Sequence, residues 1–320
     1  MLTRRNFLTR TIAAGIFLRG IPSIATASQP STPVNFEIPP HACDCHTHYY
    51  GDPREFPLSP QHVYTPEGLR LEEMPALHRA LKIERTVIVT PSVYGTDNAA
   101  TLFCMKALGA SARGIAVVDD KTSESEMDTM YRRGIRGGRI IATPIGLPDP
   151  AAGRPIFQAA AARFQRHNWH IQIYADLALV SAIKDLVLAS TVPTVFDHFG
   201  GLQAGRGPQQ QGFADLVELV RSGRAYVKIS GAYRSSTREP DYPDLVPFAK
   251  MLIEANPDRI LWGTDWPHPA PPIARKDASE PMPLFPMDDG RLLNLLPIWA
   301  PDPAIRRKIL VDNPARLFRF

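Results

Sequence analysis

The chain has 320 residues, of which 44% are hydrophobic and 21% charged, and this composition is that of a soluble globular protein with a sizeable core. Its length suits one large domain. The formal net charge of +4 comes from residues 1–27, which carry four arginines and no acidic residue, so 32 basic and 32 acidic residues remain beyond them. Nucleic-acid binding needs a clustered basic face, and we expect no nucleic-acid partner.

Residues 1–27 have the pattern of an export signal. The pair Arg4-Arg5 resembles a twin-arginine motif, and it is followed by an apolar stretch, Ile12–Leu18, and by the small-residue site Ala25-Thr26-Ala27. The apolar stretch is too short to cross a bilayer. We therefore expect the twin-arginine export machinery as a partner, a periplasmic location, and no stable membrane insertion once the signal is removed.

Residues 28–41, rich in proline, serine and threonine, are expected to form a linker or N-terminal arm. In residues 42–320, short apolar or β-branched runs alternate with longer helix-like patterns, as in a parallel sheet with crossover helices. Eight runs predict strands: Ala42–His48, Thr86–Pro91, Arg113–Asp119, Gly134–Ile141, His170–Tyr174, Thr194–His198, Tyr226–Ser230 and Ile260–Asp265.

The segments between and after these strands predict helices: Pro66–Leu81, Thr96–Leu108, Ser123–Arg132, Ile156–His167, Leu177–Ala189, Phe213–Ser222, Tyr242–Ala255, Gly290–Trp299 and Pro303–Leu310, with a final short helix opening at Asp312. Eight strands with intervening helices predict a single α/β domain, a closed (β/α)8 barrel of the TIM type, over residues 42–320.

Two histidines at the end of the first predicted strand are the clearest sign of chemistry, because working groups in such a barrel lie at the C-terminal ends of strands. His46 and His48 are two residues apart, so both are expected to face the barrel interior. By the same alternation, Cys43 and Cys45 are expected to point outward and to pack as small hydrophobic side chains between the barrel and its helices.

His198 and Asp265 end the sixth and eighth predicted strands. Either the histidines and Asp265 bind a divalent metal that activates water, or Asp265 is the general base for water while the histidines polarise a carbonyl. The fourth and fifth strands end without a residue that bridges two metals, which excludes a two-metal site. We favour catalysis without a cofactor; the alternative is a single zinc ion on His46, His48 and Asp265.

Five further polar residues are candidates for holding a substrate. Arg139 lies near the working end of the fourth strand, where a guanidinium can clamp a carboxylate. Tyr174 occupies the working end of the fifth strand, and Arg234 follows the seventh. Tyr64 and Ser92 lie in the loops after the first and second strands.

Seven motifs together resemble the amidohydrolase-related lactonases, in particular 2-pyrone-4,6-dicarboxylate lactonase and its sugar-lactone relatives. They are Asp44–His48, Tyr64–Pro66, Pro91–Asn98, Gly134–Arg139, Asp197–Gly200, Trp262–His268 and Asp312–Leu317, within residues 40–320. The resemblance implies a barrel that hydrolyses lactones, often without a metal. Carried over by motif, Asp265 would activate water and His46, His48 and His198 would polarise the lactone carbonyl. It further implies that Tyr64, Ser92, Arg139, Tyr174 and Arg234 would hold the substrate and its carboxylates.

One departure from this family concerns the substrate. The pyrone dicarboxylate enzymes carry a second basic residue shortly after the one that matches Arg139, and here residues 140–146 contain none. A monocarboxylate or sugar-acid lactone is therefore an alternative to a pyrone dicarboxylate.

Other functions remain open on the same barrel: a lactone isomerase, a zinc-dependent decarboxylase, or an exported protein that only binds carboxylates. Isomerase relatives lose part of the histidine and aspartate set, which this chain keeps, so hydrolysis is favoured. The sequence leaves the oligomeric state open.

Overall fold

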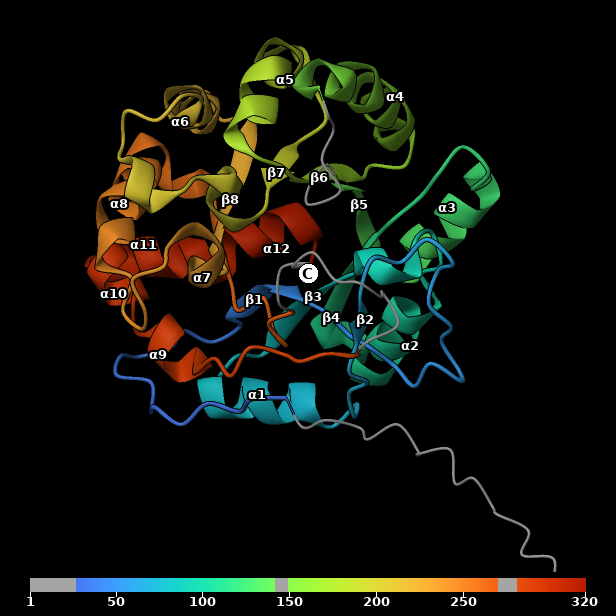
Figure 1. Ribbon diagram of the computed structural model, residues 1–320, viewed down its shortest axis with the longest axis horizontal. Coiled ribbons are helices and arrows are strands. Elements are labelled where there is room, and N and C mark those ends of the chain that lie inside the picture. The colour runs from blue at the N-terminus through green and yellow to red at the C-terminus, as the bar shows by residue number, and fades with distance from the viewer. Residues whose placement is uncertain (1–26, 142–148, 270–280) are drawn as a thin grey trace, which may run out of the picture.

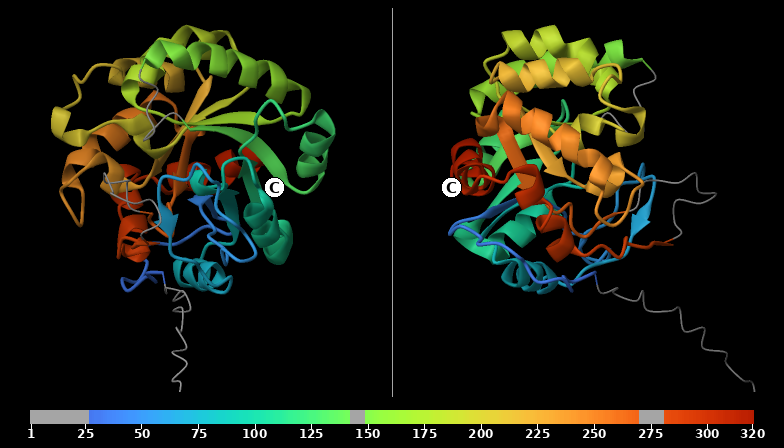
Figure 2. Two further views of the ribbon diagram at one scale, coloured as in Figure 1. Left: turned by 45° about the vertical axis from the view of Figure 1, so that its right-hand side comes forward. Right: turned by 90° about the vertical axis from the view of Figure 1, so that its left-hand side faces the viewer.

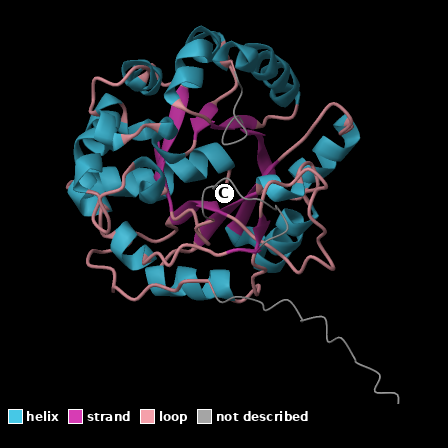
Figure 3. Ribbon diagram, in the orientation of Figure 1, coloured by secondary structure: helices cyan, strands magenta, loops and turns pink. Residues whose placement is uncertain are grey.

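The structure is a computed structural model that describes residues 27–141, 149–269 and 281–320. Apart from Ala27, the expected export signal lies outside the described residues. Eight parallel strands form one sheet inside a ring of helices (Figures 1 and 3). In sheet order they are β1 Cys43–Thr47, β3 Arg85–Val89, β4 Ala112–Ala116, β5 Ile135–Ile141, β6 His170–Tyr174, β7 Thr194–Phe196, β8 Ala225–Ser230 and β9 Ile260–Gly263.

The first and last strands meet and bring the sheet round into a barrel. The backbone N–H of His48 donates to the carbonyl of Trp266 at 2.8 Å, and the N–H of Asp265 donates to the carbonyl of His46 at 2.8 Å. Thr47 and Trp266 form the corresponding parallel bridge. The expected (β/α)8 barrel is confirmed, and three of the residues at this seam, His46, His48 and Asp265, are candidate catalytic residues.

Helices surround the barrel, and one of them, α12, lies across one of its ends. They are α1 Glu73–Leu81, α2 Ala99–Leu108, α3 Glu124–Arg132, α4 Gly153–Arg166, α5 Leu177–Ala189, α6 Phe213–Arg221, α7 Ala232–Ser235, α8 Val246–Ala255, α9 Asp289–Leu293, α10 Leu296–Trp299, α11 Pro303–Arg307 and α12 Asn313–Phe318. Two short strands, β2 Thr65–Pro66 and β10 Pro281–Met282, pair with each other outside the barrel. Among the described residues no helix has the length and apolar character that a membrane span requires.

Local sequence signals explain several helix boundaries. Ser123 caps α3 and accepts a hydrogen bond from the N–H of Glu126, whose side chain accepts one from the N–H of Ser123 in return. The predicted helix over 290–299 is divided into α9 and α10, and Pro297 stands at the start of the second because it lacks the N–H that a continuous helix needs. The first predicted helix begins at Glu73 rather than Pro66, since Pro66 belongs to β2.

Near its N-terminal end the barrel interior is filled by apolar side chains from six strands and from α12. The right-hand view of Figure 2 places α12 and the chain end at one end of the barrel and β2 at the other. The buried members of this interior cluster are Cys43, Cys45, Val87, Val89, Ile115, Val195, Tyr226, Leu261, Leu317 and Phe318.

The position of the two cysteines corrects the sequence-based expectation, which placed them between the barrel and its helices. The pairing of β1 with β3 is irregular between Asp44 and Thr47, so strict alternation fails there. Cys45 and the next residue, His46, therefore both face inward. Thr47 faces outward and contacts Thr86.

The N-terminal arm, residues 28–41, contains no helix or strand but lies against the barrel. The Asp288 carboxylate accepts hydrogen bonds from the backbone and hydroxyl groups of Ser31 and Thr32. The carbonyl of Ser28 accepts one from the Trp266 indole at 3.2 Å.

Candidate active site at the C-terminal end of the barrel

The four residues expected to carry chemistry lie together at the C-terminal ends of their strands. Asp265 Oδ1 is 3.6 Å from His46 Nε2, 3.6 Å from His48 Nε2 and 3.7 Å from His198 Nε2. All four side chains are almost completely buried. Three imidazole nitrogens therefore surround one carboxylate oxygen at distances longer than direct hydrogen bonds.

The backbone at this point adopts a conformation that L-residues rarely adopt. Asp265 has φ 68°, His198 has φ 47° and Phe199 has φ 55°. Such positive values cost of order 1–3 kcal/mol each and persist where surrounding structure imposes them, commonly at functional sites. Here they turn the chain sharply at the ends of β7 and β9, so that the side chains of His198 and Asp265 point into the barrel mouth.

The second oxygen of Asp265 is held by two donors from α7. Tyr233 donates its hydroxyl proton to Oδ2 at 2.6 Å, and the Arg234 Nε–H donates to the same atom at 2.6 Å. Burial alone would raise the pKa of Asp265, but the Arg234 guanidinium and the imidazoles lower it well below its usual range. Asp265 is thus an ionised carboxylate with Oδ1 turned toward the histidines.

The histidines are neutral at neutral pH because they are buried. Burial lowers the pKa of His46 well below its usual value, and the Lys228 ammonium adds to this effect. Burial also lowers the pKa of His48, and it lowers that of His198 to about 4. At neutral pH each ring therefore carries one proton, and the nitrogen that holds it determines what the ring can do.

For His48 that choice is fixed by a backbone group. His48 Nδ1 lies 2.7 Å from the carbonyl oxygen of Val89, which can only accept, so Nδ1 carries the proton. The Nε2 of a neutral His48 then presents a lone pair to the centre of the site. His198 Nδ1 lies 3.0 Å from the Ser230 hydroxyl, which can donate or accept.

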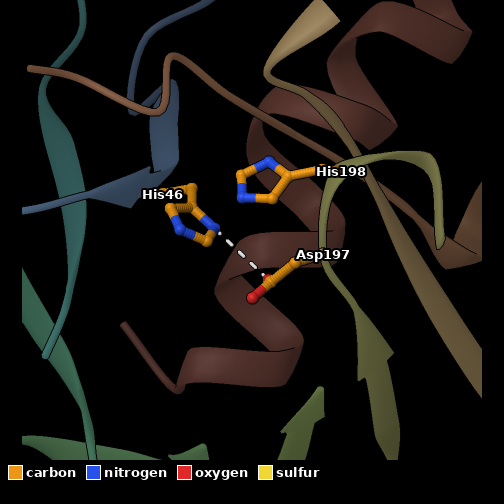
Figure 4. A group of neighbouring side chains, drawn as sticks. All are labelled: His46, Asp197 and His198. Atoms are coloured by element: carbon orange, nitrogen blue, oxygen red, sulfur yellow. Dashed lines mark ion pairs between the residues drawn. The ribbon is translucent and has the colours of Figure 1, made fainter. Parts of the chain in front are cut away.

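A polar layer beneath the histidines was not anticipated from the sequence. Lys228 on β8 is fully buried; its Nζ donates to Gln172 Oε1 at 2.7 Å and lies 3.3 Å from His46 Nδ1. Asp197 Oδ1 lies 3.3 Å from both Lys228 Nζ and His46 Nδ1 (Figure 4 draws the latter ion pair), and Gln172 Nε2 donates to Asp197 Oδ2 at 3.1 Å. Lys228, Gln172 and Asp197 thus form a polar group on the Nδ1 side of His46.

The sequence held a signal for this layer. Lys228 interrupts the apolar run of a predicted inner strand at the same parity as Ser230, and Asp197 precedes His198 in a motif already noted. A lysine within such a strand has to find polar partners inside the barrel.

The proposed substrate side chains border the same space. Arg139 is 8% exposed; its NH2 group donates to Asp197 Oδ2 at 3.3 Å, while its buried Nε has no hydrogen-bond partner among the described residues. The Arg139 and Arg234 guanidinium carbons lie 5.8 and 6.0 Å from the centre of the Tyr174 ring. Tyr174 in turn meets the His198 ring edge-on at 5.4 Å.

The Tyr64 hydroxyl lies 3.2 Å from that of Tyr50. Burial raises the pKa of Tyr64, while hydrogen bonding to the Tyr50 and Ser92 hydroxyls opposes this shift. Ser92 begins a short 3₁₀ turn, Ser92–Tyr94, after β3. Of the segment that lacks the second basic residue, residues 140–146, positions 142–146 lie outside the described residues.

By residue type and spacing alone, some of the donor atoms also match a single divalent metal site. His46, His48 and Asp265 offer ligand atoms within 4.8 Å of one another, and His46, Asp197 and His198 form a second such group. His46 Nε2 and Asp265 Oδ1 are buried and have no hydrogen-bond partner among the described residues. Two imidazoles and a carboxylate are a common zinc ligand set.

The fold and these residues define a buried imidazole–carboxylate site in a (β/α)8 barrel, as found in hydrolases, and comparison with known proteins gives the family. The amidohydrolase family model, Amidohydro_2, matches residues 43–320. The chain therefore belongs to the amidohydrolase family, in agreement with the resemblance seen in its motifs.

Similar proteins include lactone hydrolases. The chain is 36% identical to a Rhizobium radiobacter protein named 4-sulfomuconolactone hydrolase, over 93% of this chain and 97% of the relative. It is 33% identical to a Comamonas testosteroni protein named 2-pyrone-4,6-dicarboxylate hydrolase, over 91% and 94% of the two chains. A crystal structure of an Agrobacterium tumefaciens protein superposes with a TM-score of 0.75 at 28% identity, over 91% of this chain and 98% of that one.

Proposed function

We propose that this protein hydrolyses the ester bond of a carboxylated lactone, with Asp265 as the general base. The observation that carries the proposal is the placement of three imidazole nitrogens within 3.7 Å of Asp265 Oδ1. Oδ2 is held by Tyr233 and Arg234, so Oδ1 is the oxygen that can receive a proton. Relatives named as lactone hydrolases, matched over almost their whole length, support the reaction class.

The residues perform hydrolysis as follows. Asp265 Oδ1 takes a proton from water while the water oxygen bonds to the lactone carbonyl carbon. The carbonyl oxygen gains negative charge, which N–H groups of His46 and His198 stabilise. The ring C–O bond then breaks, and the ring oxygen takes the proton from Asp265, giving a hydroxy acid.

The role of His48 in this scheme differs from the carbonyl polarisation that the family resemblance implies. Because its Nδ1–H is committed to Val89, its neutral Nε2 can accept but cannot donate. We assign it to orienting the attacking water. If a divalent metal is bound, His46, His48 and Asp265 would hold it, and it would supply Lewis-acid polarisation of the carbonyl and of the water.

The substrate carries at least one acidic group. Arg139, with its buried Nε directed to no described partner, suits a carboxylate or sulfonate, and Tyr64, Ser92 and Tyr174 border the same mouth. Arg234 fixes Asp265 and faces Tyr174. A lactone with a single acidic group near Arg139 accords with the lack of a second basic residue after it.

A screen of lactones separates the candidate functions. Purified protein, analysed for metal, is offered 4-sulfomuconolactone, 2-pyrone-4,6-dicarboxylate and sugar-acid lactones, and acid release is followed with and without a chelator. We expect a ring-opened acid, formed equally well after chelation. An isomeric lactone would identify an isomerase, and release of carbon dioxide that chelation abolishes would identify a zinc-dependent decarboxylase.

We also propose that the protein is exported to the periplasm, on the pattern of residues 1–27. The test is cell fractionation of the full chain and of an Arg4→Lys, Arg5→Lys double variant. Retention of the double variant in the cytoplasm with the unchanged chain in the periplasm supports export, and an unchanged chain found in the cytoplasm contradicts it.

A further inference from the structure

His46 Nδ1 has two neighbours that make opposite demands on it. Lys228 Nζ and Asp197 Oδ1 both lie 3.3 Å away. An ammonium group can only donate and a carboxylate can only accept, whereas a neutral imidazole has one N–H and one lone pair. The neighbour that pairs with Nδ1 therefore decides whether Nε2, at the centre of the site, is a hydrogen-bond donor or a lone pair.

The geometry favours Lys228. Its contact with His46 Nδ1 has the geometry of a hydrogen bond, whereas the contact of Asp197 Oδ1 with the same nitrogen, also at 3.3 Å, does not. The three N–H bonds of the ammonium face three acceptors: Gln172 Oε1, Asp197 Oδ1 and His46 Nδ1. Asp197 has other donors on Oδ2, from Arg139 and Gln172, so its charge is compensated without a proton from His46. Figure 4 shows Asp197 beside His46, below the level of His198.

We infer that Lys228 is a positioning residue that holds the His46 proton on Nε2, so that the site accepts an oxygen atom of water or substrate in preference to a metal ion. This inference rests on the site of the proposed function and deepens it. A water molecule can then accept a hydrogen bond from His46 and donate one each to His48 and Asp265. A metal ion needs a lone pair on His46 Nε2, which this tautomer lacks.

The first test uses the unaltered protein. It is prepared with ¹⁵N-labelled histidine, and the ring nitrogens of His46 are identified by comparison with a His46→Gln variant. We expect Nε2 of His46 to carry the proton and Nδ1 to be unprotonated at pH 7, the reverse of His48. A His46 ring protonated on Nδ1 would overturn the inference. No lactone is involved, so this result is independent of whether the proposed reaction is correct.

The second test is zinc binding by metal-stripped protein, measured by titration calorimetry. Lys228→Met removes the donor to Nδ1 and leaves Asp197 to accept from it, so zinc should bind at least about tenfold more tightly than to the unaltered protein. Because loss of a positive charge alone favours a cation, Arg139→Gln serves as the matched control: it removes a charge beside Asp197 without touching His46, and its effect should be clearly smaller.

Equal gains in the two variants, or no gain in Lys228→Met, would overturn the inference. Circular dichroism establishes that each variant is folded. Should Lys228→Met not fold, the nitrogen spectra of the unaltered protein still decide the question.

Discussion

Asp265 joins the two halves of the site because its oxygens face different partners. Oδ2 is tied to Tyr233 and Arg234 on α7, and Oδ1 faces the three imidazoles from β1 and the end of β7. The ion pair with Arg234 keeps Asp265 charged and also fixes the orientation of its carboxylate. A carboxylate whose pKa is held low is a weak base in water, so the proposed reaction also depends on His46 and His198 stabilising the negative charge that develops on the carbonyl oxygen as the water attacks.

Arg139 gives the residue-scale prediction about the substrate. Replacing Arg139 by Ala removes a charge-assisted hydrogen bond to a substrate carboxylate, so KM for carboxylated lactones should rise about 10- to 100-fold, with a smaller change in kcat. An uncharged lactone of the same ring size is the control, and its KM should change little. Steady-state kinetics on both substrates check this, and an unchanged KM for the carboxylated lactone would remove Arg139 from substrate binding.

Residue by residue, the sequence predicted the groups at strand ends but not the groups that hold them. His46, His48, His198 and Asp265 could be placed together because barrel topology brings strand ends into one mouth. Lys228 and its partner Gln172 lie in the middle of their strands, where sequence reasoning expects apolar core. Only the three-dimensional register of β6, β7 and β8 shows that these polar residues meet.

At the scale of elements, the seam between β1 and β9 determines the position of His46. The bulge in β1 turns Cys45 and His46 both inward, which a two-residue alternation cannot predict. Opposite His46, Gly263 on β9 leaves no space for a side chain, because a Cβ there would lie 2.7 Å from the His46 backbone nitrogen and 2.8 Å from its Cβ. A side chain at this position would force the strands apart.

Gly263→Ala should therefore disturb both the seam and the site. We expect a loss of about 1–3 kcal/mol in the free energy of unfolding, as in other overpacked cores, together with a marked loss of kcat. Gly205→Ala is the matched control, since nothing lies within 4 Å of a Cβ there, and its stability should change by less than about 0.5 kcal/mol. Urea unfolding and kinetics measure both, and equal behaviour of the two variants would contradict the close approach at the seam.

Across the whole molecule, the barrel keeps several histidines neutral by burying them. The folded-state pKa of His198 is lowered to about 4 and that of His170, near the opposite end of the barrel, to about 3, both chiefly by burial. Their usual pKa is 6.5. Below this value the unfolded chain binds protons that the folded chain does not, so stability falls as the pH decreases from about 6.5 toward about 4.

The size of this effect can be measured. Each histidine that stays neutral should cost about 2 kcal/mol of stability between about pH 7 and pH 5. Urea unfolding at the two pH values tests this. His170 lies away from the proposed chemistry. In a His170→Asn variant, the loss of unfolding free energy between the two pH values should be smaller by about 2 kcal/mol. A free energy of unfolding that is equal at the two pH values would show that the rings are not held neutral.

The barrel itself was the part of the structure that the sequence predicted best. Each predicted strand overlaps an observed one, because apolar runs of strand length between helical patterns leave few alternatives. Helix boundaries were harder to predict at Pro66 and Pro297. The pairing of β2 with β10 and the division of α9 from α10 depend on contacts beyond the local sequence pattern.

Hydrolysis in ¹⁸O-labelled water is the most direct measurement of the central claim, with a carboxylated lactone as substrate and mass spectrometry of the product. We expect one ¹⁸O atom in the newly formed carboxylate and none in the released hydroxyl group. An Asp265→Asn variant should retain substrate affinity but turn over about a thousandfold more slowly. If the folded protein forms no ring-opened acid from any lactone, or if Asp265→Asn turns over as fast as the unaltered protein, the proposed hydrolysis with Asp265 as general base is wrong.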